Sequence, residues 1–241
     1  MRRLRIRTGA PALFGAMLAV ALLVFFPMRL ALGWAGAAEQ GLVARAVTGS
    51  IWGATLSEAK FGDLGLGDVA ARLSPLPLLV GRATLAIEGP GGQGAPPLSG
   101  RAFVSRHAAG IEAFTGRLAT GTAFQPLPVT ALDLDGVTAR FEDEACVTAE
   151  GRVRATLAGD VAGVVLPPTI EGVARCDAGA LLLPLASAAG TEAVAFRIFA
   201  DGRYRADLAV RPTDPVVIAR LAASGFTLGP AGYALSVEGR F

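Results

Sequence analysis

The chain has 241 residues, of which 52% are apolar, and a formal net charge of +2 at pH 7. That small charge, with no Lys/Arg run after the first residues and no basic–aromatic pattern, gives no basis for nucleic-acid binding. The 31 glycines, 15 prolines and 7% aromatic residues favour frequent turns, few long helices and one β-rich domain behind an N-terminal extension.

The N-terminal extension holds the first predicted element, an apolar helix. Four arginines lie within the first seven residues, and residues 10–28 follow without a charge. This length suffices to cross a bilayer as a helix, and the arginines are expected to stay on the cytoplasmic side. A signal peptide cleaved near residues 33–38 is the alternative, but the apolar residues that continue through Leu32 favour an uncleaved anchor.

We therefore expect two parts in the chain. Residues 1–36 would form a cytoplasmic tip and a transmembrane signal anchor that contacts the membrane through residues 10–32. Residues 37–241 would form a periplasmic, mainly β domain, built as one curved antiparallel sheet or two packed layers with one or two short helices at the edge. Trp34, beside the apolar segment, is a better candidate for a membrane-interface residue than Trp52.

Short alternating segments with glycine turns dominate the rest of the sequence. Residues 46–56 are predicted to be a strand with a bend, in which Trp52 packs in the first part of the sheet and not on a ligand. Alternation predicts strands at 83–89 and on both sides of residues 177–179, and a Pro/Gly-rich loop is expected at 88–100.

Two Asp-Gly pairs predict hairpins. Asp135-Gly136 and Asp201-Gly202 each lie between alternating runs, where glycine supplies the positive φ angle of a tight turn. The alternation around the second pair predicts a sheet with one apolar face and one solvated face.

Two segments have helical features. Residues 108–119 are a candidate short helix, although Gly116 weakens it. Residues 215–226 are predicted to be a helix because Pro215 stands at the start and Asp214 is suited to cap it.

The two cysteines, Cys146 and Cys176, both lie in the part predicted to be exported. In an oxidising compartment an even pair predicts a disulfide, which would close a loop of about 30 residues and stabilise the fold by roughly 3–4 kcal/mol. Two buried free thiols are the alternative. Neither cysteine belongs to a CxxC motif or lies near a histidine in sequence, so we expect no metal site and no thiol redox chemistry.

No combination of residues points to catalysis. His107 is the only histidine, which excludes a histidine-rich metal site, and an exposed loop position is expected for it. Neither a Gly-x-Ser-x-Gly nucleophile elbow nor a phosphate-binding glycine motif is present. The acidic residues 142–144 lack the spacing of a calcium loop and predict a solvated turn. We therefore expect no enzyme activity and no cofactor; a hydrolase would need a polar cleft assembled from residues distant in sequence.

Four segments resemble the type II secretion system protein N (GspN) family. The first, "ARAVTGSIWGATL", carries Gly49, Trp52 and Gly53, and the second, "LSPLPLLVGRATLAIEG", carries Pro75 and Gly81. The third is the pair of cysteine-bearing strand regions, and the fourth is the C-terminal end of the chain. The order and spacing of these segments are more specific than any one of them alone.

This resemblance implies a non-enzymatic, bitopic inner-membrane component of the type II secretion machinery with its bulk in the periplasm. The implied role is to support assembly of the apparatus or export of substrates across the outer membrane. The implied partners are other secretion components in the inner membrane and periplasm. The alternative is an AsmA-like lipid-handling module: a continuous open apolar groove would favour it, and a core closed by side chains would remove it.

Overall fold

A computed structural model describes residues 10–34, 36–39, 41–91, 96–161, 163–230 and 232–240. The helices are α1 (Ala10–Val24), α2 (Met28–Trp34), α3 (Pro75–Leu78) and α4 (Pro215–Ala223). The strands are β1 (Leu42–Val43), β2 (Ala46–Ser50), β3 (Gly53–Phe61), β4 (Leu64–Leu73), β5 (Ala83–Gly89), β6 (Leu98–Val104), β7 (Ala108–Ala119), β8 (Val129–Glu142), β9 (Ala145–Leu157), β10 (Asp160–Val161), β11 (Val164–Val165), β12 (Thr169–Val173), β13 (Arg175–Asp177), β14 (Ala180–Ala186), β15 (Glu192–Ile198), β16 (Arg203–Val210), β17 (Thr227–Gly229) and β18 (Gly232–Arg240).

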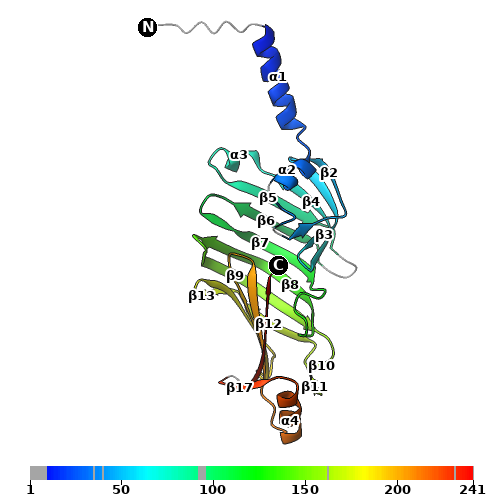
Figure 1. Cartoon of the computed structure of the whole chain (residues 1–241), viewed down its shortest axis with the longest axis vertical. Coiled ribbons are helices and arrows are strands. Elements are labelled where there is room, and N and C mark those ends of the chain that lie inside the picture. The colour runs from blue at the N-terminus through cyan, green and yellow to red at the C-terminus, as the bar shows by residue number, and fades with distance from the viewer. Residues whose placement is uncertain are drawn as a thin grey trace.

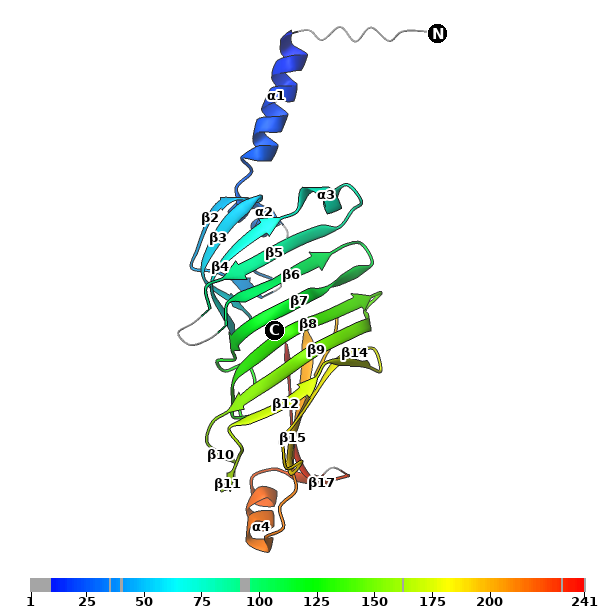
Figure 2. The ribbon, with the colours of Figure 1, turned by 180° about the vertical axis from the view of Figure 1, so that it is seen from behind.

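Sixteen of these strands form one antiparallel sheet in the described part of the chain. Its main path is β1-β3-β4-β5-β6-β7-β8-β9-β12-β14-β15-β16-β18-β17, with β2 paired to β3 and β13 paired to β14. The strands near the N-terminus cross the long axis of the molecule, whereas β15 and β18 run more nearly along it (Figures 1 and 2). The predicted mainly β fold is confirmed. Of the two arrangements that the sequence left open, the structure has the single curved sheet and not two packed layers.

Alternation along the strands gives the sheet an apolar inner face, the side that carries Leu56, Val69, Leu134 and Val153. Two clusters of buried side chains lie on this face. The N-terminal cluster is built from α2, β3, β4, β6 and β7, and the C-terminal cluster from β8 through β16. Ile111 and Leu134 pack against both clusters, so the apolar face continues from one end of the sheet to the other.

Loops and a helix cover the C-terminal part of the inner face. Phe124 comes from the β7–β8 connection, and its ring lies 4.7 Å from that of Phe196 and 5.3 Å from that of Tyr204. Leu166 and Leu221, from the β11–β12 connection and α4, are buried in the same cluster. Over this half, the described residues form a closed core and not an open groove.

The apolar N-terminal segment differs from the single long helix that the sequence predicts through residues 10–28. Helix α1 ends at Val24, and no helix among the described residues is both long enough and apolar enough to cross a membrane. Pro27 lacks a backbone N–H and restricts the residue before it, which separates α1 from α2. Helix α2 then packs against β2 and buries Met28. Residues 10–32 therefore do not form the one continuous membrane-contacting helix that the sequence predicts.

The expected helix at residues 108–119 is wrong, because these residues form β7. The register of β7 against β8 shifts between Ile111 and Phe114, and Ala113 has a positive φ of 48°. The bulge turns Ile111 and Phe114 to the same inner face although they are three residues apart. This spacing imitates the periodicity of a helix.

Of the two predicted Asp-Gly hairpins, one is absent. Asp135 and Gly136 lie inside the continuous strand β8, at a bulge where Gly136 has a φ of 62° and its N–H donates to Thr115 Oγ1 at 3.0 Å. Asp201 and Gly202 do join β15 to β16, in a connection longer than the two-residue turn expected. The positive φ of glycine therefore serves a bulge in one case and a turn in the other.

The C-terminal helix begins as predicted. Asp214 is its N-cap, and the carboxylate accepts a hydrogen bond from the Val216 N–H at 2.8 Å. Helix α4 ends at Ala223, three residues earlier than the predicted end. Helices α2 and α3 were not anticipated from the sequence, which predicts only one or two short helices beyond the anchor.

Candidate functional site

No catalytic or metal-binding arrangement occurs among the residues that the structure describes. No group of three or more His, Cys, Asp or Glu side chains there could hold a metal ion. His107 is exposed, and its Nδ1 lies 3.2 Å from Asp143 Oδ1. Asp143 and Glu144 form the solvated turn between β8 and β9 that the sequence predicts.

The two cysteines are joined in the structure. Cys146 at the start of β9 forms a disulfide with Cys176 on β13. Beside it, the Cys146 N–H donates to the Gly179 carbonyl oxygen at 2.8 Å. The bridge therefore ties β9 to the short strand and turn that precede β14, at the margin of the C-terminal cluster.

The outer face, the side that carries Arg154, Arg197 and Arg205, is a network of exposed ion pairs. Arg205 contacts both Asp207 (3.0 Å) and Glu238 (3.4 Å), and the hydrogen bond with Asp207 raises the pKa of Arg205. The backbone N–H of Arg203 donates a hydrogen bond to the Asp201 carboxylate, and the Arg203 side chain donates a second one. Both bonds lower the pKa of Asp201, the backbone bond by the larger amount. These pairs match the solvated sheet face that the sequence predicts.

The five residues singled out by the family resemblance gather at the end of the sheet nearest α1. Gly49, Trp52 and Gly53 lie on the β2–β3 hairpin, Pro75 is the first residue of α3, and Gly81 lies in the turn after it. Both elements lie at the α1 end of the long axis (Figures 1 and 2). We call this end, formed by residues 25–34, 49–53 and 73–82, the proximal end.

Backbone hydrogen bonds connect the three segments of the proximal end through one residue. The Ile51 N–H donates to the Phe26 carbonyl oxygen at 3.0 Å, and the Ile51 carbonyl oxygen accepts from the Leu73 N–H at 3.0 Å. The segment leaving α1 and the segment entering α3 are therefore both hydrogen-bonded to the same residue.

Gly49 is required by the hairpin, whereas Gly53 is not. Gly49 has a φ of +99°, and a Cβ there would lie 2.3 Å from the Gly53 carbonyl oxygen. A Cβ on Gly53 would meet no atom within 4 Å. Trp52 is half-buried and forms the turn with Ile51, at the bend that the sequence predicts within residues 46–56.

The segment that begins at Pro75 is exposed, a property that its family motif does not predict. In α3 and the turn after it, Leu76, Leu79 and Val80 are 76%, 85% and 82% exposed. The sequence feature that could have indicated this exposure is the apolar run PLPLLV at residues 75–80. It shows neither the alternation of a strand nor the polar and apolar faces of an amphipathic helix. The proximal end can therefore offer apolar contact.

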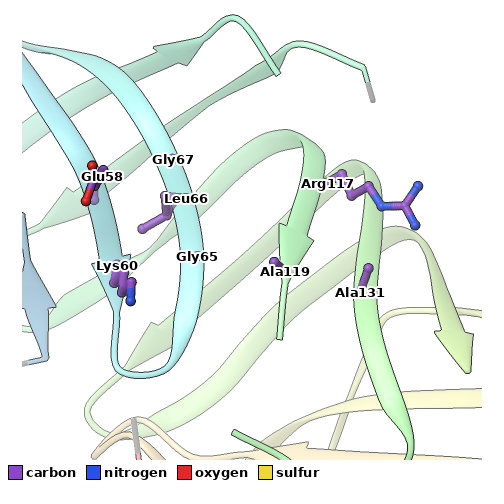
Figure 3. A pocket seen from close by; sticks show the side chains of 9 residues that line it. Glu58, Lys60, Gly65, Leu66, Gly67, Arg117, Ala119 and Ala131 are labelled. Carbon is purple, nitrogen blue, oxygen red and sulfur yellow. The ribbon is translucent and has the colours of Figure 1, made fainter. Parts of the chain in front are cut away.

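A separate hollow of about 440 Å³ opens where β4 leaves β5 and pairs with β7 through Gly65 and Ala119 (Figure 3). Glu58 and Lys60 from β3 line one side, and Arg117 lines the other. Glu58 pairs with Arg45 at 2.7 Å. The lining combines small and apolar residues with charged side chains of both signs.

The comparisons with known proteins give one match. The family model of type II secretion system (T2SS) protein N matches residues 40–235. No curated protein and no solved structure matches the chain. The matched range contains both cysteines and the residues Gly49, Trp52, Gly53, Pro75 and Gly81, and it leaves α1 outside.

Proposed function

Because the chain belongs to the type II secretion system protein N family, we propose that it is a non-enzymatic secretion component anchored in the inner membrane. Its β domain lies in the periplasm and supports assembly of the machinery or export of substrates across the outer membrane. The partners are other secretion components in the inner membrane and periplasm. The observation that carries this proposal is the family match over most of the chain.

The exposure of α1 supports the membrane anchorage. The large apolar side chains of this helix whose exposure the structure describes stand in solvent; they are Leu13, Phe14, Met17, Leu18, Val20, Leu22 and Val24. An uncharged helix exposed on all sides needs an apolar environment. The arginines in the first seven residues favour a cytoplasmic N-terminus.

The disulfide and the closed core support the remaining parts of the proposal. A disulfide between Cys146 and Cys176 is suited to an oxidising compartment such as the periplasm. The C-terminal part of the inner face is filled by side chains, which does not favour the lipid-handling alternative. The absence of a metal-binding group among the described residues gives no support to enzyme activity.

A deletion strain tests the secretion role. We expect the deletion to reduce the proteins secreted by the type II route, measured by mass spectrometry of the culture medium, and the intact gene to restore them. Affinity isolation of the full chain from solubilised membranes should recover inner-membrane secretion components. Normal secretion together with no recovered component would refute the proposed role.

A fusion experiment tests the topology separately. Alkaline phosphatase is active only in the periplasm, so fusion after residue 241 is expected to be active. An inactive fusion with normal abundance would contradict the periplasmic location. Carbonate extraction of membranes should leave the full chain in the pellet, and its release into the supernatant would contradict anchorage.

A further inference from the structure

We propose that the turn formed by α3 and the residues after it is a second membrane contact, which inserts Leu76, Leu79 and Val80 into the leaflet from which α1 emerges. This inference rests on the anchorage proposed for α1. It adds a docking surface on the β domain itself, distinct from the anchor.

The turn is built to hold apolar side chains outward. No residue of α3 is buried, and Leu76, Leu79 and Val80 are each more than three-quarters exposed. Pro75 begins the helix, and Gly81 closes the turn with a φ of +74°. Proline fixes φ and so limits the conformations of the segment.

Backbone hydrogen bonds reinforce this shape. The N–H groups of Leu79, Val80 and Gly81 donate to the carbonyl oxygens three residues earlier, at 3.2, 3.1 and 3.0 Å. The Ser74 N–H donates to the Thr84 carbonyl oxygen at 2.9 Å and fixes the base of the turn on β5. The exposed apolar group is thus part of an ordered turn that is joined to the sheet on both sides.

The position of the turn identifies what covers it. Ile51 bonds both Phe26, which follows α1, and Leu73, which precedes α3. The two segments are therefore held next to each other by hydrogen bonds to one residue. A bilayer that holds α1 lies within reach of α3, and both stand at one end of the molecule (Figures 1 and 2).

Other residues of the proximal end have the character of a membrane interface. Phe25 and Trp34 are 77% and 82% exposed, and the Trp34 ring lies 5.5 Å from that of Phe26. Helix α2 buries Met28 against the sheet while Leu30 and the charged Arg29 face outward. Tryptophan and arginine beside exposed apolar side chains are typical of residues that lie at the level of lipid headgroups.

A bilayer accounts for this surface better than a protein partner does. The exposed side chains of the turn, Leu76, Leu79 and Val80, are aliphatic and carry no group that could form a hydrogen bond with a protein partner. The surface also continues into Phe25 and α1, which the same membrane covers. A surface for a second copy of the chain or for a secretion partner could lie anywhere on the domain, whereas a surface for the bilayer has to lie beside the anchor.

Depth-sensitive fluorescence on the full chain tests the inference. Leu79→Cys is labelled with an environment-sensitive nitrobenzoxadiazole probe under non-reducing conditions, which keep the native disulfide intact. Val165→Cys is the matched control, because Val165 is 84% exposed and its strand, β11, lies at the end of the molecule opposite α1 (Figure 2). Each protein is reconstituted into phosphatidylethanolamine–phosphatidylglycerol vesicles and recovered by flotation.

The probe at position 79 is expected to shift its emission to the blue and to lose intensity when the vesicles contain lipid spin-labelled near the headgroup. The probe at position 165 should show neither change. Circular dichroism of both variants should match the unaltered protein, because both positions are exposed.

Three outcomes would overturn the inference, and they are distinguishable. Equal, water-like emission from both probes in protein that floats rejects the second contact but leaves the anchor intact. A blue shift at position 79 without quenching by spin-labelled lipid means that protein covers the turn. Protein that does not float refutes the anchorage as well.

Discussion

At the residue scale, individual backbone and side-chain positions explain why this sequence forms its turns and core contacts. Gly49 is the residue whose replacement the structure forbids most clearly at the proximal end, because its φ is positive and backbone oxygen lies where a Cβ would be. Tyr204 has a comparable role in the C-terminal cluster, where its hydroxyl donates to the Ala123 carbonyl oxygen. Gly49 allows β2 and β3 to approach each other in their hairpin. Tyr204 joins β16 to the β7–β8 connection.

Gly49→Ala is expected to destabilise the protein. The left-handed conformation costs an alanine roughly 1–2 kcal/mol, and the overlap with the Gly53 carbonyl oxygen adds to this cost. Gly53→Ala is the matched control and should change the free energy of unfolding by less than about 0.5 kcal/mol. Urea denaturation of the purified proteins measures both. Equal stabilities of the two variants would contradict the role assigned to Gly49.

Tyr204→Phe should lower stability by about 1 kcal/mol at neutral pH, because one hydrogen bond is lost. Burial, followed by the negative charge of Asp63, raises the pKa of Tyr204 in the folded protein. The unfolded tyrosine therefore ionises first, above pH about 10, and the contribution of Tyr204 to stability falls as the pH rises further.

The stability gap between the native protein and the Tyr204→Phe variant should consequently shrink between neutral pH and pH about 11. Urea denaturation across this range measures the gap. If the difference in unfolding free energy between the two proteins stays constant or widens, the raised pKa of Tyr204 does not contribute to the pH dependence of stability.

At the element scale, bulges and caps decide what the strands and helices do. The bulge in β7 places Ile111 and Phe114 on one face, and the bulge in β8 lets the strand continue through Gly136. The disulfide has a similar local role, since it holds β13 beside the start of β9. Short β13 has only three residues, so the covalent link matters more there than in a long strand.

Removal of the disulfide is expected to cost stability. The bridge joins residues separated by 30 positions, and the chain-entropy model assigns such a loop roughly 3–4 kcal/mol. The double variant Cys146→Ser, Cys176→Ser should therefore unfold at a lower urea concentration than the oxidised native protein. A reductant should lower the native midpoint and leave that of the variant unchanged. Identical midpoints for the oxidised native protein and the variant would show that the bridge contributes nothing.

At the scale of the whole molecule, one sheet carries two apolar clusters that share Ile111 and Leu134. Strands β8 and β9 lie near the middle of the strand order and are the longest, with 14 and 13 residues. The edge strands β1 and β17 have only two and three residues. Stability should accordingly be greatest in the middle and least at the two edges.

Amide hydrogen exchange should follow this gradient. We expect the slowest exchange in β8 and β9, whose backbone groups are paired on both sides, and the fastest in β1 and β17. Mass spectrometry of peptides from the exchanged protein measures the order. Edge strands as protected as β8 would indicate that something covers them in solution.

Local patterns in the sequence determined the class of fold and many elements. The alternation at 194–210, the cap at Asp214, the turn at 178–179 and the even cysteine pair each predict a feature that the structure contains. These features depend on neighbours in sequence or on the chemistry of one residue type. The resemblance carried by Gly49, Trp52 and Pro75 indicated the family that the comparison then established.

Only the tertiary structure decided which side chains meet and which stay in solvent. Bulges account for two of the differences: residues 108–119 form a bulged strand where a helix is a candidate, and strand β8 continues through the Asp-Gly pair at 135–136 where a hairpin is predicted. The break between α1 and α2 follows from Pro27 itself, whereas the packing of α2 depends on its contact with β2. The exposure of Leu79 depends on whether any other part of the folded chain covers its turn, which a local pattern does not encode.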